Sequence, residues 1–397
     1  MIVIVIYCYR RMGYNKEKIA WVVPKTYNTQ SRIFKESQSL ASRGYRIKIY
    51  SMNENNTNLA YENQNGVDIE RVYPRLFTYD SDELLNRTLL LPVFTVKVII
   101  RLVRFKPDLV YCSNLPSVHV GLICKLLFNA KVIYDSHDLF VEQPGRYKYS
   151  LIKRKVLMLY EGVSARIVDA VIQTTEGRCQ LFKKYYGIQP IQIMNKPLPK
   201  PKEDGITDIS TYLDEDKTIV GYVGSVLPNR GLEIMAEVAT KFPKVQFVIL
   251  GYAKGKWAQS FIDTNRERIT LIPPVPPSEI TSVLERFDIG ISLIQNTGLS
   301  YFYSCPTKVF ELIASGTPQI ASNFPEIRKL VKESNGYPVG EVIDPSDPQQ
   351  LTQSLERLLS STTLYEKYKN NCVKIRHKCL WESEEKKLLK LVELVLK

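Results

Sequence analysis

Apolar strand-like runs alternate with helical segments along both halves of this 397-residue chain, and this alternation predicts an α/β protein built on parallel sheets. Residues 245–251 and 289–294 are apolar almost throughout, which is typical of strands buried on both faces of such a sheet. Residues 197–217, rich in proline and charge, separate two such series. With 44% hydrophobic residues, the chain is long enough to form two cores. We therefore predict two Rossmann-like domains that face a cleft.

The domain boundaries follow from the same elements. We expect a first domain at residues 1–196, a linker at 197–217, a second domain at 218–380 and a terminal helical segment at 381–397. The acidic run at 214–216 imitates a metal-binding D-x-D motif. It lies in the linker rather than after a strand inside a sheet, so we assign no metal site to it.

The basic residues are concentrated in one half of the chain. Residues 1–200 contain 30 Lys and Arg against 16 Asp and Glu, whereas residues 201–397 contain 24 against 25. A basic half can meet an anionic substrate, a membrane surface or nucleic acid. The seven cysteines include no C-x-x-C pair, which favours reduced cytoplasmic thiols over disulfides or a zinc site. The apolar residues 1–8 are too few to span a bilayer and are interpreted as an N-terminal extension.

The first domain begins with a strand at residues 19–23, a helix that carries Ile33 and Leu40, and a strand from Arg46, which together predict a βαβ unit. Residues 67–73 alternate between apolar and polar side chains, as expected of another strand.

Residues 89–106 have the pattern of a basic amphipathic helix. Lys97, Arg101 and Arg104 are spaced at four and three residues and therefore share one face. Much of the remaining surface is apolar, with Val96, Ile99, Ile100 and Val103. Such a helix can lie in a membrane interface with its cations on lipid phosphates. It can equally be a core helix with a solvated basic stripe.

Residues 131–138 predict a strand that runs into a loop, and Asp135, His137 and Asp138 fall at its carboxyl end. Ligands of open parallel sheets bind at that edge. Two carboxylates beside His137 would fix the tautomer of a reactive histidine, although a histidine with purely structural partners is the commoner outcome. A second basic helix is expected at 146–167, with consecutive cations at 153–155.

The second domain opens with a strand at residues 218–225 that contains Gly221 and Gly224. These glycines allow the backbone to approach a ligand closely. Arg230 and Gly231 precede the next helix, so the arginine and the helix amides can share a diphosphate. A glycine loop of this kind is weak evidence by itself.

Residues 303–322 contain the clearest local signals. Pro306 is suited to the start of a helix, and Gly316 with the following Thr-Pro ends it after about three turns. The helix N-terminus and Lys308 in its first turn suit an anionic group such as a phosphate. Glu311 lies three residues further along the same face, where it can accept hydrogen bonds from sugar or ribose hydroxyls. An ordinary surface ion pair between these two residues would explain the spacing equally well.

The run P-T-K-V-F-E-L-I-A-S-G-T-P, residues 306–318, resembles the donor-binding segment of glycosyltransferase group 1, family 4 of the enzymes with the GT-B fold. In that family a glutamate at the position of Glu311 holds the ribose of a nucleotide-sugar donor. Many members carry a second glutamate that touches the transferred sugar, and Tyr303 occupies that position here. The run Y-D-S-H-D-L-F resembles the family loop in which a histidine, His137 here, approaches the acceptor and the sugar.

The resemblance therefore implies a complete site. On the donor side we expect Gly224, Ser225, Arg230, Lys308, Val309 and Glu311. On the acceptor or sugar side we expect Asp135, His137, Asp138 and Tyr303. The family's glycine loop usually carries an early and a later cation on the diphosphate. Arg230 matches the later one, Ser225 replaces the earlier one, and Lys308 can supply the missing charge.

The family transfers glycosyl groups with retention of configuration, by a front-face step in which the departing diphosphate oxygen assists deprotonation of the acceptor hydroxyl. The resemblance thus implies a hexosyl- or hexosaminyltransferase, with His137, Arg230 and Lys308 as catalytic residues. The nucleotide-diphosphate-sugar is its donor substrate, with no other cofactor and no metal. We expect a glycan or lipid-linked acceptor and a cytoplasmic protein that docks on the inner face of an anionic membrane. Residues 381–397 resemble the tail helix that crosses back to the first domain in GT-B proteins.

Three other interpretations are open. Tyr303 and Ser225 depart from the family pattern, which would suit a catalytically silent subunit that binds nucleotide without turnover. A nucleotide-sugar epimerase would share the second domain, but it needs acid–base groups in the cleft and the chain has only three histidines. A nucleic-acid-binding protein would explain the charge, but the chain contains no recognised nucleic-acid module and its basic helices are rich in large apolar residues, so we predict no nucleic-acid partner.

Overall fold

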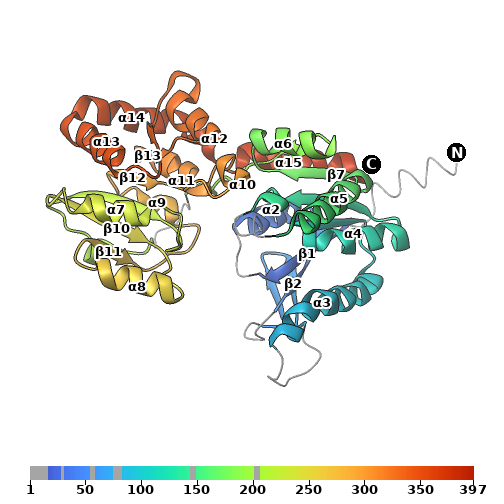
Figure 1. Cartoon of the computed structure of the whole chain (residues 1–397). Helices are drawn as coiled ribbons and strands as arrows, with labels where there is room; N and C mark the ends of the chain where they lie inside the picture. Colours follow the sequence, from blue (N-terminus) through green and yellow to red (C-terminus); the bar gives the residue numbers. More distant parts are fainter. Residues whose placement is uncertain (1–16, 28–30, 54–58, 75–82, 144–148, 201–205) are drawn as a thin grey trace.

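The computed structural model describes residues 17–27, 31–53, 59–74, 83–143, 149–200 and 206–397. The chain forms two α/β domains that lie side by side, each with helices on both faces of a sheet (Figure 1). The predicted fold class is therefore confirmed. The predicted N-terminal extension lies outside the described residues. Among the described helices, none combines the length and the apolar character needed to cross a membrane.

The first sheet has the order β3-β4-β2-β1-β5-β6-β7-β8 within the described residues, and only the β3–β4 pair is antiparallel. Its central strands are buried on both faces, which explains their nearly continuous apolar sequences. The strands are β1 (Lys18–Thr26), β2 (Arg46–Met52), β3 (Tyr61–Gln64), β4 (Val67–Val72), β5 (Leu109–Ser113), β6 (Lys131–Ser136), β7 (Ala170–Gln173) and β8 (Ile191–Gln192).

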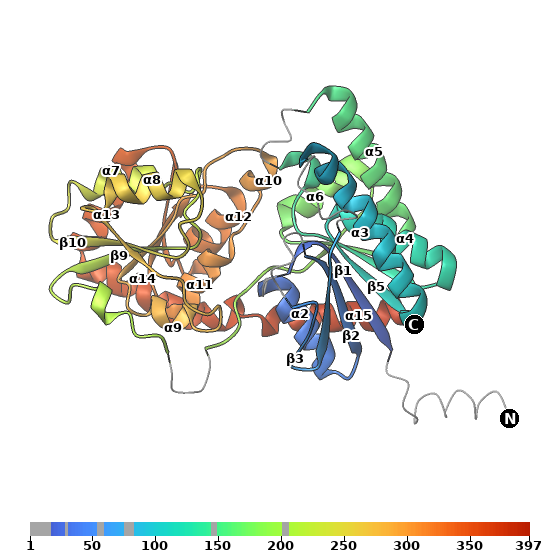
Figure 2. The same ribbon diagram turned by 90° about the horizontal axis from the view of Figure 1, so that it is seen from below.

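Helices cover both faces of this sheet. Side chains of α3, α4, α5 and α6 pack into one apolar core, and those of α2 pack into the core on the opposite face. Figure 2 shows α3, α4 and α5 side by side at the outer face of the domain. The elements are α2 (Ser31–Ser42), α3 (Glu83–Phe105), α4 (Leu115–Phe128), η1 (Phe140–Glu142), α5 (Leu151–Ile167) and α6 (Glu176–Tyr186).

The second sheet is parallel throughout, with the order β11-β10-β9-β12-β13-β14. Its strands are β9 (Thr218–Val223), β10 (Val245–Leu250), β11 (Ile269–Ile272), β12 (Ile289–Ser292), β13 (Gln319–Ser322) and β14 (Gly340–Ile343). Its helices are α7 (Leu232–Ala239), α8 (Lys256–Asn265), α9 (Ile280–Leu284), α10 (Leu299–Phe302), α11 (Thr307–Ser315), α12 (Pro325–Arg328), α13 (Pro348–Ser360) and α14 (Thr362–Ile375). Shorter turns are η3 (Ser210–Tyr212), η4 (Lys329–Glu333), η5 (Ser334–Gly336) and η6 (Arg376–Cys379).

The last helix, α15 (Glu382–Leu396), returns to the first domain and packs against α2. Leu388 and Val392 are buried in the same core as the side chains of α2. The Trp381 indole donates a hydrogen bond of 2.9 Å to the Ser39 hydroxyl. Lys196, at the end of the first domain, pairs with Glu384 at 2.7 Å. The first domain therefore depends on the C-terminal segment to complete its core.

We expect Leu388→Ala to lower the free energy of unfolding of the first domain by about 2–5 kcal/mol, because it leaves a cavity in a packed core. Leu388 is fully buried, whereas Leu394 on the same helix is 59% exposed. Leu394→Ala is the matched control and should change stability by less than about 0.5 kcal/mol. Urea unfolding followed by intrinsic fluorescence measures both effects. Equal destabilisation by the two substitutions would contradict the packing described here.

Candidate functional site

Helix α11 presents one face to the core of its domain and the other to the first domain. Pro306 is its N-cap residue, and Gly316 ends it in the left-handed conformation at φ 84°, where a glycine carries no steric penalty. Phe310 and Ile313 are buried in the core of the second domain. Val309 is also fully buried there, and its amide donates to the Pro306 carbonyl at 3.0 Å. The side chain of Val309 therefore lies on the core face of the helix, and its expected contact with the donor stays a prediction that involves the backbone alone.

Lys308 lies against the glycine loop that follows β9. Gly224 has φ 130°, and a Cβ at this position would come within 3.1 Å of Lys308 Nζ. The same Nζ lies 3.8 Å from the centroid of the Tyr222 ring, a favourable cation–π distance. Ser225 is exposed, and its backbone carbonyl accepts a hydrogen bond of 3.1 Å from the Tyr222 hydroxyl. The positive φ of residue 224 and the nearby ammonium group both favour glycine at this position.

Arg230 brings a second positive charge to this place. Its guanidinium lies 5.3 Å from the ring centroid of Tyr301 and approaches the Tyr301 hydroxyl at 3.5 Å. Burial lowers the pKa of Lys308 well below its usual value, and the charge of Arg230 lowers it further. Among the described residues, no carboxylate lies within ion-pair distance of Lys308 or Arg230. Glu311 acts on Lys308 through its charge without forming an ion pair. Two cations at a helix N-terminus form a site suited to phosphate oxygens.

Glu311 faces a cavity of about 420 Å³ between the two domains. The cavity is lined by Phe34, Lys35, Pro197, Leu198, Pro277, Ser278, Ile280, Thr307 and Glu311. Burial raises the pKa of Glu311, and the charges of Lys35 and Lys308 oppose that rise. Burial lowers the pKa of Lys35 to about 7, against the opposing effect of Glu311. The Lys35 ammonium donates to the Asn195 side chain at 2.8 Å and to the Lys196 carbonyl. No sequence pattern indicated Lys35, because it comes from α2 of the other domain.

On the first-domain side, Asp135 lies at the end of β6 in a buried ionic cluster. Arg32 binds its two carboxylate oxygens at 3.0 and 2.9 Å and also pairs with Glu36 at 3.1 Å. His137 Nε2 lies 2.9 Å from Asp135 Oδ2. Burial alone would raise the pKa of Asp135, but the charges of Arg32 and His137 outweigh it and hold that pKa at about 2. Asp135 is fully buried, so its predicted contact with the acceptor is wrong, and it instead orients His137.

Arg178 connects the histidine loop to the second domain. Its guanidinium donates to the His137 carbonyl at 2.7 Å and to the Ser300 carbonyl at 3.1 and 2.6 Å. It also pairs with Asp138 at 3.0 Å, whose other carboxylate oxygen accepts a hydrogen bond of 3.1 Å from Gln143. Asp138 is therefore engaged by structural partners. No local pattern indicated Arg32 or Arg178, because the contacts that bring them to the site are distant along the chain. Asp135 is 103 residues from Arg32, and the His137 and Ser300 carbonyls are 41 and 122 residues from Arg178.

Tyr303 belongs to the contact between the domains. Its ring packs on Gly177, where an added Cβ would come within 2.3 Å of the ring. Its carbonyl accepts a hydrogen bond of 2.6 Å from the Thr175 hydroxyl, and Glu326 accepts one of 2.8 Å from the Gly177 amide. The ring of Tyr303 therefore packs one domain on the other, and its expected contact with a bound sugar stays a prediction.

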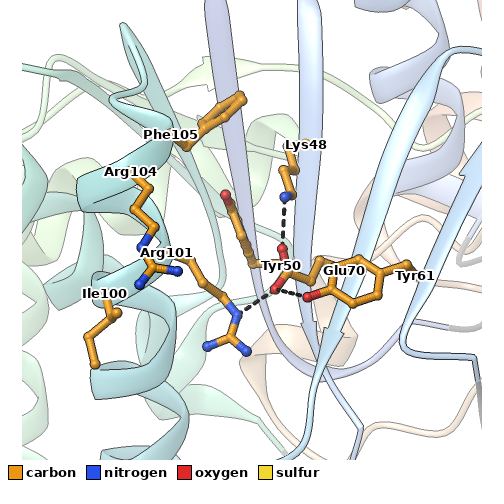
Figure 3. A pocket seen from close by; sticks show the side chains of 8 residues that line it. All are labelled: Lys48, Tyr50, Tyr61, Glu70, Ile100, Arg101, Arg104 and Phe105. Carbon is orange, nitrogen blue, oxygen red and sulfur yellow. Dashed lines mark hydrogen bonds and ion pairs between the residues drawn. The ribbon is translucent and has the colours of Figure 1, made fainter.

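The predicted basic face of α3 is also used internally. Figure 3 shows Arg101 directed at Glu70, whose carboxylate accepts hydrogen bonds from Arg101 and Lys48. All three residues line a cavity of about 430 Å³. Lys97 donates to the Tyr73 carbonyl at 3.1 Å, while Arg104 lines the same cavity and is exposed. Arg101 is therefore not the free cation on this face that the sequence pattern indicated, because the buried carboxylate of Glu70 on β4 neutralises its charge.

Sequence models of two families match the chain, one in each half. A model described as "Glycosyltransferase Family 4" matches residues 30–195, and one described as "Glycosyl transferases group 1" matches residues 207–374. The chain is 24% identical over 245 residues to TuaH of Bacillus subtilis, which is named as a teichuronic acid biosynthesis glycosyltransferase. That match covers 58% of this chain and spans 58% of the length of TuaH.

Solved structures share the whole architecture. A sucrose-phosphate synthase from Thermosynechococcus elongatus superposes with a TM-score of 0.78 at 16% identity, over 96% of this chain and 99% of that one. HepE from Anabaena, in complex with UDP and glucose, gives 0.71 at 14% identity over 95% and 99%. WaaG, a glycosyltransferase involved in lipopolysaccharide biosynthesis, gives 0.66 at 13% identity over 93% and 98%. These similarities show the two-domain GT-B fold.

The low pKa of Asp135 predicts an acid-sensitive fold. A carboxylate whose pKa falls from 3.8 to about 2 on folding contributes roughly 2 kcal/mol to stability above pH 4, and this contribution is lost as the pH falls towards 2. In Arg32→Met, Asp135 loses its cation, so burial should raise its pKa above the unfolded value. That variant should be less stable by about 3–5 kcal/mol at pH 7 and should approach the wild type on acidification.

Urea unfolding of the wild type and of Arg32→Met at pH 7, 5 and 3.5 measures how the free energy of unfolding of each protein depends on pH. Because other carboxylates such as Glu70 and Glu384 also have lowered pKa values, the informative quantity is the difference between wild type and variant at each pH. A difference that stays constant over this range would exclude the Arg32–Asp135 pair as its source.

Proposed function

Because this chain belongs to the group 1 glycosyltransferases, we propose that it transfers a sugar, with retention of configuration, from a nucleotide-diphosphate-sugar to a hydroxyl group of a glycan or lipid-linked acceptor. The observation that carries the proposal is the pair of cations, Lys308 and Arg230, near Gly224, neither of which forms an ion pair within the described residues. Glu311 follows one helical turn along α11, facing a cavity. In a nucleotide the diphosphate is bonded directly to the ribose, so one helical turn between Lys308 and Glu311 suits these two groups.

The donor would be held in two parts. Glu311 would accept hydrogen bonds from the ribose, with the nucleoside in the 420 Å³ cavity between α2 and α11. The diphosphate would lie on Lys308, Arg230 and the N-terminal amides of α11. The complex of HepE with UDP and glucose supports a nucleotide-diphosphate donor. The two cations supply the positive charge that a diphosphate requires, so we propose that transfer needs no metal.

The transfer step would take place on one face of the sugar. The bond between the anomeric carbon and the diphosphate oxygen breaks, and its electron pair stays on the diphosphate. The acceptor oxygen forms the new bond on the same face, and its proton passes to the departing diphosphate oxygen. Lys308 and Arg230 would stabilise the charge that develops there, a contribution that is often the largest in catalysis.

His137 would face the acceptor and the transferred hexosyl or hexosaminyl group. Asp135 and Arg178 hold its ring and its carbonyl, so the imidazole is oriented by the first domain while its backbone is tied to the second. The names of TuaH and WaaG both concern glycans of the bacterial envelope. They support a cell-surface glycan precursor as the acceptor, met at the cytoplasmic face of the membrane.

We expect Glu311→Gln to weaken nucleotide-sugar binding by about 1–3 kcal/mol, because a charged hydrogen bond to the ribose is lost while the shape is kept. Since burial raises the pKa of Glu311 above its usual 4.5, wild-type affinity should fall on acidification before an ordinary glutamate would titrate. Only the ionised form accepts both ribose hydroxyls. The glutamine variant should lack this pH dependence.

Titration calorimetry against UDP-, GDP-, ADP- and dTDP-sugars, after a thermal-shift screen to choose the base, measures this effect. A ligand at a hundredfold its dissociation constant adds about 2.7 kcal/mol to stability, which such a screen detects. Glu356→Gln, at an exposed position of α13, is the matched control and should bind as the wild type does. Unchanged affinity in Glu311→Gln would refute its role in donor binding.

We expect His137→Ala to lower kcat by about a hundredfold or more, with less than about a threefold change in the dissociation constant of the donor, because the residue acts on the acceptor side. His377→Ala, at an exposed position in η6, is the control. Release of free nucleotide from the donor, with and without a candidate acceptor, supplies the rates. Parallel loss of donor affinity and turnover would assign His137 a structural role instead.

A further inference from the structure

The first half of α5 projects from the first domain with an apolar surface that nothing in the described structure covers. Every fully buried residue of α5 lies in its second half, from Glu161 onward. In the first half, Leu151 is 74% exposed, Ile152 77%, Val156 59% and Leu159 68%. Figure 2 shows this end of α5 at the periphery of the domain, beyond α3 and α4. An apolar helix segment left in water marks an interaction surface.

The exposed apolar residues form one stripe. Ile152, Val156, Leu159 and Val163 are spaced at four, three and four residues, and all four are exposed. This spacing places them along one side of an α-helix. The apolar part of the helix is far too short to span a bilayer, and its length suits a helix that lies in the plane of a membrane interface.

Cations flank the stripe. Lys153 and Lys155 are both exposed, and Lys153 Nζ lies 3.9 Å from the Tyr149 ring centroid. Arg154, between them, pairs with Glu142 of η1 at 3.1 Å and so fixes the helix to the domain. Residues 1–200 carry 30 Lys and Arg against 16 Asp and Glu. A second copy of this chain would bring the same positive charge to the contact, whereas an anionic lipid surface is complementary to it.

The stripe lies close to the candidate acceptor site. η1 follows the His137 loop directly and packs against α10 of the second domain. Through the Arg154–Glu142 pair, the first half of α5 is joined to η1. The exposed end of α5 therefore lies at the edge of the first sheet where β6 ends and His137 begins the loop. A surface bound by α5 would lie close to an acceptor bound at His137.

We propose that the stripe of Ile152, Val156, Leu159 and Val163 on α5 docks in the interface of an anionic phospholipid membrane, with these four side chains among the acyl chains and Lys153 and Lys155 on lipid phosphates. The docking surface is thus assigned to α5 and not to α3, because Arg101 of α3 is bound by Glu70. It rests on the proposed function only in its consequence, which is that the acceptor is carried on a lipid and reaches His137 from this membrane.

Flotation with vesicles of phosphatidylcholine alone, or with about a third phosphatidylglycerol, tests the docking surface. The wild type should float with the anionic vesicles at low salt and should be released as salt rises, because the Lys contribution is screened over about a Debye length. Ile152→Glu/Leu159→Glu should lower the partition coefficient at least about tenfold, since two apolar side chains leave the lipid and two negative charges are added. Both residues are exposed, so the double variant should fold normally.

Two further variants make the test specific. Val373→Glu/Leu394→Glu adds the same charges at exposed apolar positions of α14 and α15 and should float as the wild type does. Lys153→Gln/Lys155→Gln keeps the apolar stripe and should weaken binding to anionic vesicles while reducing its salt dependence. Nucleotide affinity should be unchanged in every variant, so loss of flotation is separable from failure of the proposed transferase function.

A wild type that ignores anionic vesicles at low salt would overturn the proposal. So would equal loss of flotation in the α5 double variant and in the control double variant. A wild type that is dimeric in solution and becomes monomeric in Ile152→Glu/Leu159→Glu, with no vesicle binding by either, would assign the stripe to contact between copies instead.

Discussion

The buried guanidinium of Arg178 is the contact on which the geometry of the interdomain site depends. It binds the carbonyls of His137 and Ser300, which belong to different domains, together with the carboxylate of Asp138. A planar group with several fixed donors suits this task, because each acceptor constrains the orientation of the others. The loop that carries His137 is thus positioned by the second domain as much as by its own strand. Packing of Tyr303 on Gly177 supports the same contact.

The two sides of the site differ in how their charges are balanced. In the first domain, Arg32 lies between Asp135 and Glu36 in a buried cluster that fixes His137. Burial raises the pKa of Glu36 to about 8, so the charge of Arg32 is balanced by Asp135. In the second domain, Lys308 and Arg230 lie close together without a carboxylate partner among the described residues. Holding two like charges together costs stability unless an anion binds between them. That imbalance is the physical reason to expect the diphosphate on the second domain and the acceptor on the first.

The positive charge of the first domain also divides into two kinds. Arg101 and Lys48 neutralise Glu70 between a helix and the sheet, and they hold α3 in place. Lys153 and Lys155 have no such role in the described structure and stand beside apolar side chains of α5 that face water. Composition alone cannot separate these two uses of charge. The burial and the partner of each cation separate them.

The sequence by itself determined the fold class and several local elements. The ends of α11 (Thr307–Ser315), with Pro306 and Gly316 as its cap residues, follow from the chemistry of proline and glycine and needed no tertiary information. The buried strands were likewise visible as apolar runs. These features depend on residues close together in the chain, so a local pattern contains them.

Only the tertiary structure decided which side chains face the cleft. Val309 proved to be core, Asp135 a buried support for His137, and Tyr303 an interdomain contact. Lys35 and Arg178 entered the site from distant segments. A motif specifies the order of residues along a helix or loop, whereas the face that becomes buried depends on what packs against it. That partner lies more than a hundred residues away in most of these cases, and no local pattern records it.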